Sequence, residues 1–158
     1  MSIEDNKALV RRYFEDAPFH PEICAEIFTP TIPWHALYRT KNPDFVSNPQ
    51  AEKEAYERHI RLWGGWSESI DEMIAEGDRV VVHWTFHGTQ QGEYLGIPPT
   101  HKLVTFSGIY IFRIADNRIA EVWNLWDRVG EWQQLGILPE TGEILAKAKE
   151  ANSSAGTK

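Results

Sequence analysis

The sequence predicts an α+β fold: a cone-shaped, curved antiparallel sheet with helices packed on its concave face. Two observations predict it, namely the helical spacing of apolar residues early in the chain and the strand-like alternation in several consecutive segments after residue 66. Helices followed by a run of strands is the order typical of α+β proteins. At 158 residues the chain fits a single domain, which we place at residues 1–150, followed by a polar tail at 151–158 that we expect to be flexible.

The composition is that of an ordinary globular protein and excludes several classes. Hydrophobic residues make up 42% and charged residues 25% of the chain, which excludes a disordered protein. The 16 Lys and Arg against 23 Asp and Glu give a net charge of −7, and no basic run exceeds Arg11–Arg12, so we expect no nucleic-acid partner. No apolar stretch approaches the ~18–20 residues of a membrane span, so we expect no membrane partner.

Cysteine use and the N-terminal residues favour a cytoplasmic location. Cys24 is the only cysteine, so an intrachain disulfide and a metal site built on paired cysteines are both excluded. Residues 1–7 lack the basic start and the apolar run of a secretory signal. We therefore expect a cytoplasmic protein in which Cys24 is a small buried hydrophobic residue.

Two helices are predicted before residue 30. The first spans residues 3–15, with Ser2 or Asp5 available to cap it. Its apolar residues recur at helical spacing: Leu9, Val10, Tyr13 and Phe14. The second spans residues 21–28, where a proline in the first turn suits a helix. Residues 29–50 contain four prolines and are expected to be mostly extended or loop.

Two further helices are predicted later in the chain. One spans about residues 51–63 and ends at Gly64–Gly65, with His59 beside its apolar stripe. That stripe consists of Tyr56, Ile60 and Trp63. A short helix follows Asp127 and carries three apolar residues, Val129, Trp132 and Leu135.

Strand-like patterns cover three segments of the second half, residues 79–88, 103–114 and 118–126. In the first of them, apolar residues occupy every second position: Val80, Val82, Trp84 and Phe86. Residues 67–76 show helical spacing but precede a tight turn and a strand, so we assign a strand as the hairpin partner. Tight turns are expected at residues 76–78 and 115–117.

From residue 76 onward a series of short motifs follows in a characteristic order. The motifs are Gly77-Asp78-Arg79-Val80, Trp84, Gly88-Thr89, Gly92-Glu93, Gly96-Ile97-Pro98-Pro99-Thr100, Gly108-Ile109, Phe112-Arg113-Ile114, Arg118-Ile119-Ala120-Glu121-Val122-Trp123 and Gln134-Leu135-Gly136. Together they resemble the SnoaL-like polyketide cyclase, or ester cyclase, family, which belongs to the nuclear transport factor 2-like superfamily. The resemblance covers about residues 6–136 and is dense from residue 77 onward.

This resemblance implies a nuclear transport factor 2-like cone, also described as a cystatin-like roll, with a deep apolar cavity. It also implies a homodimer. The last strand supports a dimer independently, because it carries apolar residues on both faces, such as Val122 and Trp123, and helices cover only one of them. The characterised cyclases of the family perform a cofactor-free intramolecular aldol ring closure of a polyketide ester, so we expect no cofactor.

The resemblance also assigns candidate catalytic positions. In the family's characterised cyclases the acid/base is an aspartate on the last strand, and a histidine on the preceding strand faces the cavity; the matching positions here are Asn124 and Tyr110. An amide has no usable ionisable proton, so Asn124 can hold a carbonyl by a hydrogen bond but cannot act as the base. Tyr110 can donate a hydrogen bond to an oxyanion, although an unperturbed pKa of ~10 makes it a poor base.

Three other residues are candidates for proton transfer or binding. Asp127 matches a second aspartate of the family; it either takes over proton transfer or caps the helix that starts at Arg128, on the strand face opposite Asn124. His35 matches a cavity-wall histidine of many family members and is a candidate base, with a loop histidine bonded to backbone as the alternative. His59 either reaches the cavity mouth or is an ordinary half-packed helix histidine.

Aromatic residues are expected to wall the cavity, with an ordinary core as the alternative. The predicted binding residues are Trp34, His59, Trp63, Trp84, Phe86, Phe112 and Trp126. We expect no metal site, because His83 and His87 lie about 13 Å apart on a strand and cannot share a metal ion.

These features leave three hypotheses about function. The first is a small-molecule enzyme of the cyclase, isomerase or hydrolase type, acting by acid/base chemistry on a polyketide-like or other hydrophobic carbonyl substrate. The second is a dimeric protein that binds a small ligand without catalysis, which the asparagine at position 124 favours. The third is an interaction domain whose own side chains fill the cavity. We prefer the enzyme.

Overall fold

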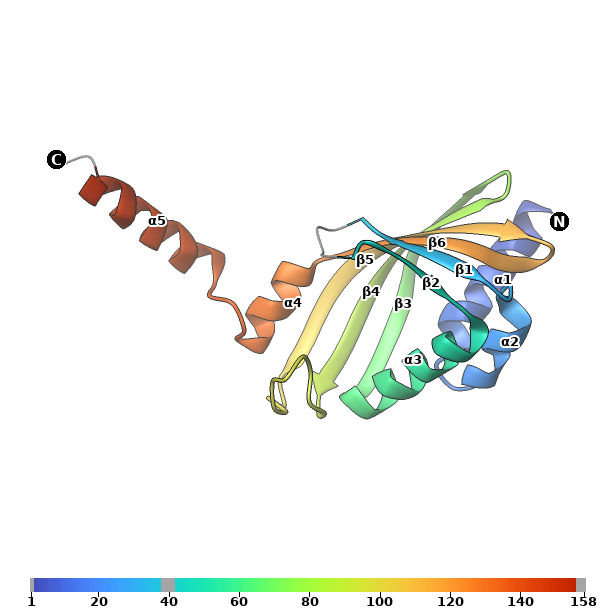
Figure 1. The fold of residues 1–158 in the computed structure, drawn as a ribbon, viewed down its shortest axis with the longest axis horizontal. Coiled ribbons are helices and arrows are strands. Elements are labelled where there is room, and N and C mark those ends of the chain that lie inside the picture. The colour runs from blue at the N-terminus through green and yellow to red at the C-terminus, as the bar shows by residue number, and fades with distance from the viewer. Residues whose placement is uncertain (1, 38–41, 156–158) are drawn as a thin grey trace.

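In a computed structural model, which describes residues 2–37 and 42–155, the chain forms a curved sheet with helices on one side (Figure 1). The strands are β1 (Ile32–Ala36), β2 (Asp44–Ser47), β3 (Trp63–Glu76), β4 (Arg79–Gln90), β5 (Leu103–Ala115) and β6 (Arg118–Trp126). The helices are α1 (Ile3–Glu15), the short turn η1 (Pro21–Ile23), α2 (Cys24–Ile27), α3 (Pro49–Leu62), α4 (Arg128–Leu135) and α5 (Thr141–Ala155). The predicted α+β class is confirmed.

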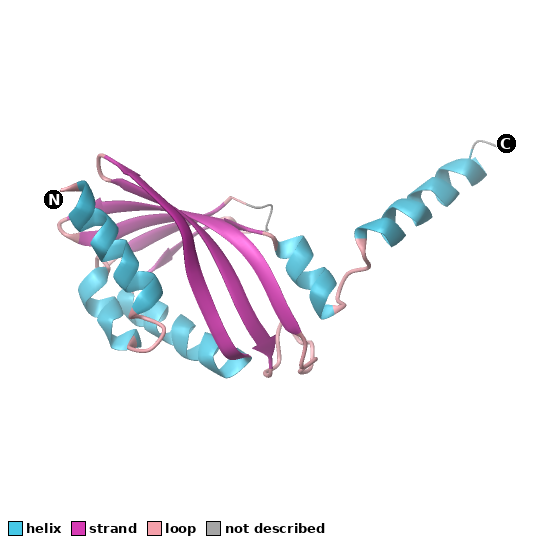
Figure 2. Cartoon of the chain, turned by 180° about the vertical axis from the view of Figure 1, so that it is seen from behind, coloured by secondary structure: helices cyan, strands magenta, loops and turns pink. Residues whose placement is uncertain are grey.

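The sheet has six strands in the order β2-β1-β6-β5-β4-β3. All neighbours are antiparallel except β1 and β6, which run parallel. Seen from behind, the sheet twists strongly, and α1, α2 and α3 gather on one side of it (Figure 2). The concave side of the sheet is therefore the side that these three helices partly close.

The predicted strands are confirmed, and their alternation sets the two faces. Along β4 the side chains of Val80, Val82, Trp84 and Phe86 are buried. The residues between them face away from the helices. The assignment of a strand to residues 67–76 is correct, and the strand begins earlier, at Trp63, because this residue is already extended where α3 ends. Residues 29–50 supply β1 and β2 within the stretch expected to be extended or loop.

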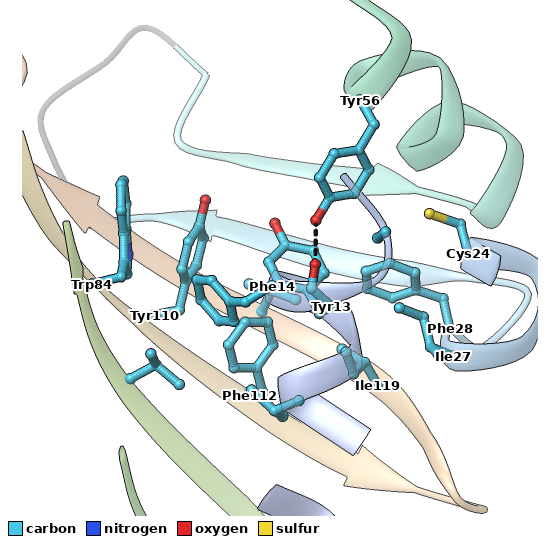
Figure 3. Close-up of a cluster of buried hydrophobic side chains, with 14 of the residues drawn as sticks. Tyr13, Phe14, Cys24, Ile27, Phe28, Tyr56, Trp84, Tyr110, Phe112 and Ile119 are labelled. Carbon is cyan, nitrogen blue, oxygen red and sulfur yellow. Dashed lines mark hydrogen bonds between the residues drawn. The ribbon is translucent and has the colours of Figure 1, made fainter. Parts of the chain in front are cut away.

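Helix α1 begins with a capping box in which Ser2 and Asp5 exchange side chain to backbone hydrogen bonds. Its four predicted apolar residues are all buried: Leu9, Val10, Tyr13 and Phe14. The ring of Tyr13 lies at the centre of an aromatic cluster (Figure 3). Its ring neighbours, at centroid distances of 5.1 to 5.9 Å, are Phe14, Phe28, Tyr56, Tyr110 and Phe112.

Helix α3 is tied to α1 by one buried hydrogen bond. The Tyr56 hydroxyl on α3 donates to the backbone carbonyl of Tyr13 at 2.9 Å, as the dashed line in Figure 3 shows. Because a buried hydroxyl without a partner costs about 1–3 kcal/mol, this bond favours one position of α3 over the sheet. The hydrogen bond therefore helps to set the distance between α3 and the sheet.

Gly108 on β5 allows a close aromatic contact at the centre of the sheet. A Cβ atom at this position would lie 2.5 Å from the Trp84 ring and 2.7 Å from the backbone oxygen of Leu125. Because glycine leaves that space empty, the Trp84 ring lies across β5 and stacks on Tyr110 with centroids 5.3 Å apart and planes at 21°. The glycine therefore fixes the orientation of Tyr110 through Trp84.

Helix α5 was not predicted. It extends away from the sheet and carries mostly exposed residues, including Ile144 and Leu145. Residues 151–155 of the expected flexible tail belong to this helix, and residues 156–158 lie outside the described residues. In the part of the chain that the structure describes, no helix is both long and apolar enough to cross a membrane.

We predict that Gly108→Ala destabilises the protein by about 1–3 kcal/mol, because the new methyl group collides with Trp84 and with backbone. Urea unfolding would measure the loss, and near-ultraviolet circular dichroism would report the displaced tryptophan. The matched control is Gly142→Ala on α5, where a Cβ would meet nothing within 4 Å. Equal stability of the two variants would contradict the packing described for Trp84.

Candidate functional site

A cavity of about 470 Å³ lies between the concave face of the sheet and α3. Its aromatic lining comes from two helices and five strands: Tyr13, Trp34, Phe45, Tyr56, Trp66, Tyr110 and Trp126. Its polar lining consists of Ser47, Glu52, Arg58, His59, Glu68 and Asn124. The site thus combines a largely aromatic wall with several groups that can donate, accept or exchange protons.

Tyr110 and Asn124 lie side by side on the inner face. They are direct partners in the β5–β6 register, and each side chain is about 8% exposed. Trp84 stacks on one side of the Tyr110 ring, and the Trp34 ring meets it edge-on at 6.0 Å. The Oδ1 atom of Asn124 is buried and has no hydrogen-bond partner among the described residues. The expectation that both residues face the cavity agrees with this geometry.

Glu52 on α3 is a buried carboxylate in the cavity wall. The Ser47 hydroxyl on β2 donates a short hydrogen bond to it. Burial raises the pKa of Glu52, and the bond from Ser47 opposes that shift. The carboxylate is therefore held in place by a neighbour.

Glu68 on β3 is the second carboxylate of the cavity and was not predicted. It is half-buried, and the described residues provide it with no hydrogen bond or ion pair. Burial raises its pKa from 4.5 to about 7. At neutral pH the group therefore exists in both protonation states.

His59 reaches the cavity from α3, as one of its two interpretations predicted. Its ring packs against Trp66 at 5.5 Å and against Phe86 at 6.4 Å. Burial lowers the pKa of His59, and the nearby positive charge of Arg58 contributes in the same direction. The imidazole is therefore neutral at neutral pH, and exposed Arg58 lies at the edge of the same cavity.

His35 does not line the cavity, contrary to the expectation from sequence. It follows Trp34 on β1, and since Trp34 points inward, strand alternation turns His35 outward. There its ring nitrogens lie 2.8 Å from Asp44 and 2.9 Å from Glu121, and its ring stacks on Trp123. The bond to Asp44, followed by that to Glu121, raises the pKa of His35 although partial burial opposes the shift.

Asp127 caps helix α4 and does not line the cavity. Its carboxylate accepts a hydrogen bond from the backbone N–H of Gly130 at 2.8 Å. This is the capping role that the sequence offered as the alternative to proton transfer. The wall therefore has no carboxylate from Asp127, and the two that it does have come from α3 and β3.

The predicted aromatic wall divides into two groups. Trp34 and Trp126 line the cavity as expected. Four others are buried in the core behind it: Trp63, Trp84, Phe86 and Phe112. Trp63, for example, packs against Phe86 at 5.2 Å and Tyr94 at 5.7 Å. Phe112 packs against Tyr13 and Phe14 of α1, and Trp84 and Phe86 pack against Phe106 of β5. Some of the predicted aromatic residues therefore form the cavity wall, and the others form an ordinary core.

Two sequence signals could have identified the missed carboxylates. Glu52 precedes Tyr56 by four residues on the same helix, which places it on the buried stripe. Glu68 lies between Trp66 and Ile70 at alternate positions of a strand, so it shares their face. In both cases an acidic residue occupies an inward position of an otherwise apolar pattern.

No metal site is found among the described residues, since no three His, Cys, Asp or Glu side chains gather there. His83 lies 3.8 Å from Asp71, and His87 lies 2.9 Å from the Thr105 hydroxyl. Both histidines are exposed on the side of β4 opposite the cavity. Their contacts are those of polar groups on an outer sheet face.

The family model described as SnoaL-like polyketide cyclase matches residues 33–135. No significant match was found among curated proteins. Among solved structures, TsrD from Streptomyces laurentii is 27% identical, covers 87% of this chain and 99% of its own, and has a TM-score of 0.73. A protein of Jannaschia sp. CCS1 assigned as a SnoaL-like polyketide cyclase is 21% identical, and the match covers 88% of this chain and 97% of that protein with a TM-score of 0.74. AclR, a candidate hydroxylase from Streptomyces galilaeus, is 21% identical, and the match covers 98% of this chain and 95% of AclR with a TM-score of 0.69.

We predict that Glu68→Gln stabilises the protein at high pH and not at low pH. The folded chain binds the Glu68 proton more tightly than the unfolded chain, so stability falls as pH rises from about 4.5 to about 7. The variant, which stays neutral, should be more stable than wild type by on the order of 1–2 kcal/mol at about pH 8 and equally stable at about pH 4.5. Urea unfolding across pH measures this; Glu72→Gln, at an exposed position on β3, is the control.

We predict the opposite pH dependence for His35→Gln. Because the pKa of His35 is raised in the folded chain, its stabilising effect is present at low pH and is lost as pH rises through the folded value. The variant should melt about 2–4 °C below wild type near pH 6, and the difference should shrink near pH 9. Thermal melts of the variant and of an exposed control, His20→Gln, test this. A deficit independent of pH would exclude the ion pairs as its cause.

Proposed function

The chain belongs to the SnoaL-like polyketide cyclase family, and we propose that it is a small-molecule enzyme that performs cofactor-free acid/base chemistry on a hydrophobic carbonyl compound. The observation that carries this proposal is the pairing of Tyr110 and Asn124 in a cavity walled by aromatic rings. Two polar groups on neighbouring strands thereby face one largely apolar space. Such a space suits a flat, hydrophobic molecule that carries a reactive oxygen.

Tyr110 and Asn124 would act on the carbonyl oxygen of the substrate. The phenol O–H and the amide N–H can both donate to an oxygen on which negative charge develops. The stacked Trp84 and the edge-on Trp34 hold the phenol ring in place, so the donor needs little reorganisation during reaction. A bound hydrophobic substrate would displace water from the cavity and so strengthen these bonds.

Proton transfer requires a different group, since the Asn124 amide does not titrate. A proton leaves the carbon next to the carbonyl, and the oxygen takes up the charge as an enolate forms. In a cyclase the enolate carbon then attacks a second carbonyl, whereas in an isomerase the proton returns at another carbon. The carboxylates and the imidazole that line the same cavity are Glu52, Glu68 and His59.

The alternative is a protein that binds a small ligand without turning it over. The asparagine at position 124, where the family resemblance implies an aspartate, is the observation that favours it. Both functions need a cavity that admits a ligand, and the pocket between the sheet and α3 supports both of them. Turnover of a carbonyl probe separates them.

A homodimer is part of the proposal. Ile109 and Leu125 form a cross-strand pair on the outer face of the sheet, and each is 42% exposed. A second copy of the chain would cover this apolar area. A cytoplasmic location is also proposed, because the single cysteine, Cys24, is a buried free thiol, as suits a reducing compartment.

We predict that the protein catalyses exchange of the α-protons of beta-tetralone, a hydrophobic ketone, for deuterium in heavy water. This exchange requires only enolate formation, so it does not depend on the natural substrate. Tyr110→Phe should slow it by roughly 10–100-fold, because an oxyanion donor is removed. Proton NMR of the ketone measures the rate.

Tyr94→Phe is the control for this experiment, because Tyr94 lies outside the cavity. It should exchange the ketone at the wild-type rate. Binding of the ketone without exchange above the buffer rate would reject the enzyme and support the ligand-binding alternative.

A further inference from the structure

We propose that Glu68 is the general acid/base of the cavity, and that this carboxylate on β3 takes the place of the aspartate that the family resemblance implies at position 124. The inference rests on the proposed function and deepens it by assigning the proton-transfer group. The proposed acid/base residue then lies on β3, three strands away in the sheet from β6, which carries position 124. The two polar groups of the β5–β6 pair then serve to hold the substrate.

The position of Glu68 in the sheet directs its carboxylate at the cavity. Trp66 and Ile70 flank it at alternate positions of β3, and Phe86 is its register partner on β4. All three are apolar residues of the inner face, packed on or within the core. Glu68 is therefore an acidic residue placed within an apolar face, and it lines the same cavity as Tyr110 and Asn124.

Glu68 differs from the other enclosed carboxylates in having no partner. Ser47 donates to Glu52, Arg113 and His35 contact Glu121, and the Trp126 indole donates to Glu131. The described residues offer no such contact to Glu68. An enclosed carboxylate without a partner lowers stability, so a role in binding or catalysis would explain its presence.

Asn124 supplies an independent sign that the cavity takes a ligand. Its side chain is 92% buried, and its Oδ1 atom has no donor within residues 2–37 and 42–155. Buried acceptors nearly always have a partner, so the missing partner is consistent with a hydrogen-bond donor, such as a hydroxyl group, supplied from outside the chain. The free carboxylate and the free amide oxygen face one space.

The groups that share the cavity with Glu68 include a single full positive charge, Arg58, which lies at an exposed position. From α1, α3 and β5 the titratable neighbours are Tyr13, Glu52, Tyr56, Arg58, His59 and Tyr110. Burial is the cause that raises the pKa of Glu68 to about 7. A group that is half ionised at neutral pH can both accept and return a proton, as acid/base catalysis requires.

The proposed step is balanced without a co-reactant. The ionised Glu68 carboxylate takes a proton from the carbon next to the substrate carbonyl. The electron pair of the broken C–H bond forms the enolate double bond, and the charge passes to the oxygen held by Tyr110. After the enolate carbon has attacked a second carbonyl, protonated Glu68 returns its proton to the new alkoxide. The carboxylate is then ready for another cycle.

Nitrobenzisoxazole tests this base directly. A base removes the ring C–H proton, the N–O bond breaks, a nitrile forms and a yellow nitrophenolate is released, so the reaction needs no oxyanion hole. Wild-type protein should accelerate it with a rate that rises with pH through a midpoint of about 7. Glu68→Gln should lower the rate by ~100-fold or more, and Glu72→Gln should leave it unchanged.

Further variants separate Glu68 from its neighbours. Glu52→Gln and His59→Gln should keep the midpoint near 7, whereas a loss of rate in either, with Glu68→Gln active, would overturn the assignment. The double variant Glu68→Gln/Asn124→Asp should regain at least ~10-fold over Glu68→Gln, because it restores a carboxylate to the same cavity. Circular dichroism confirms that each variant is folded.

A measurement on the unaltered protein covers the case in which Glu68→Gln does not fold. Carbon-13 NMR of the glutamate carboxyl carbons should show one group titrating near 7, and its absence would overturn the assignment. The experiments also distinguish failure of the proposed carbonyl chemistry from failure of the role assigned to Glu68. Base activity on nitrobenzisoxazole without exchange of beta-tetralone would reject the carbonyl chemistry and keep Glu68, whereas exchange that persists in Glu68→Gln would reject only the role of Glu68.

Discussion

The position of Tyr13 on α1 decides where the core ends and where the cavity begins. Its ring fills the inner face of the sheet beside Tyr110 and Phe112, while its backbone carbonyl accepts the hydrogen bond from Tyr56 on α3. On one side of this contact lies the cluster of buried hydrophobic side chains in Figure 3. On the other side α3 is held away from β3, β5 and β6, and the space between them stays open.

Polar groups in that space follow from the curvature of the sheet. Because the concave face is only partly covered by helices, inward positions near α3 need not be filled by apolar packing. Glu52, Glu68 and Asn124 occupy such positions, and the chain accepts the unfavourable burial of Glu68 there. The outer face shows a different arrangement around β1, β5 and β6, where charged groups pair with one another: His35 bridges Asp44 and Glu121, and Arg113 binds Glu121.

Most elements near the site could be predicted from local patterns. The family resemblance assigned Tyr110 and Asn124 to the cavity, and the helical spacing in α1 identified the residues that pack on the sheet. The same rule, applied from Trp34, would have turned His35 outward, but the family resemblance favoured the cavity. Helix α5 has no strong apolar stripe, so hydrophobic periodicity did not predict it. Its sequence favours a helix because it contains residues of high helix propensity such as Ala, Lys and Glu.

By itself, then, the sequence determined the order of elements, the inner and outer faces of β4, β5 and β6, and the amide at position 124. Only the tertiary structure decided which inward residues face a packed core and which face open space. Trp84 and Trp126 both point inward, yet Trp84 packs against Tyr110, Phe106 and Gly108 and is buried, whereas Trp126 borders the cavity. Glu52 and Glu68 line one cavity for the same reason. Sheet curvature and the Tyr56 hydrogen bond place α3 over the concave face, and this arrangement cannot be deduced from a local sequence pattern.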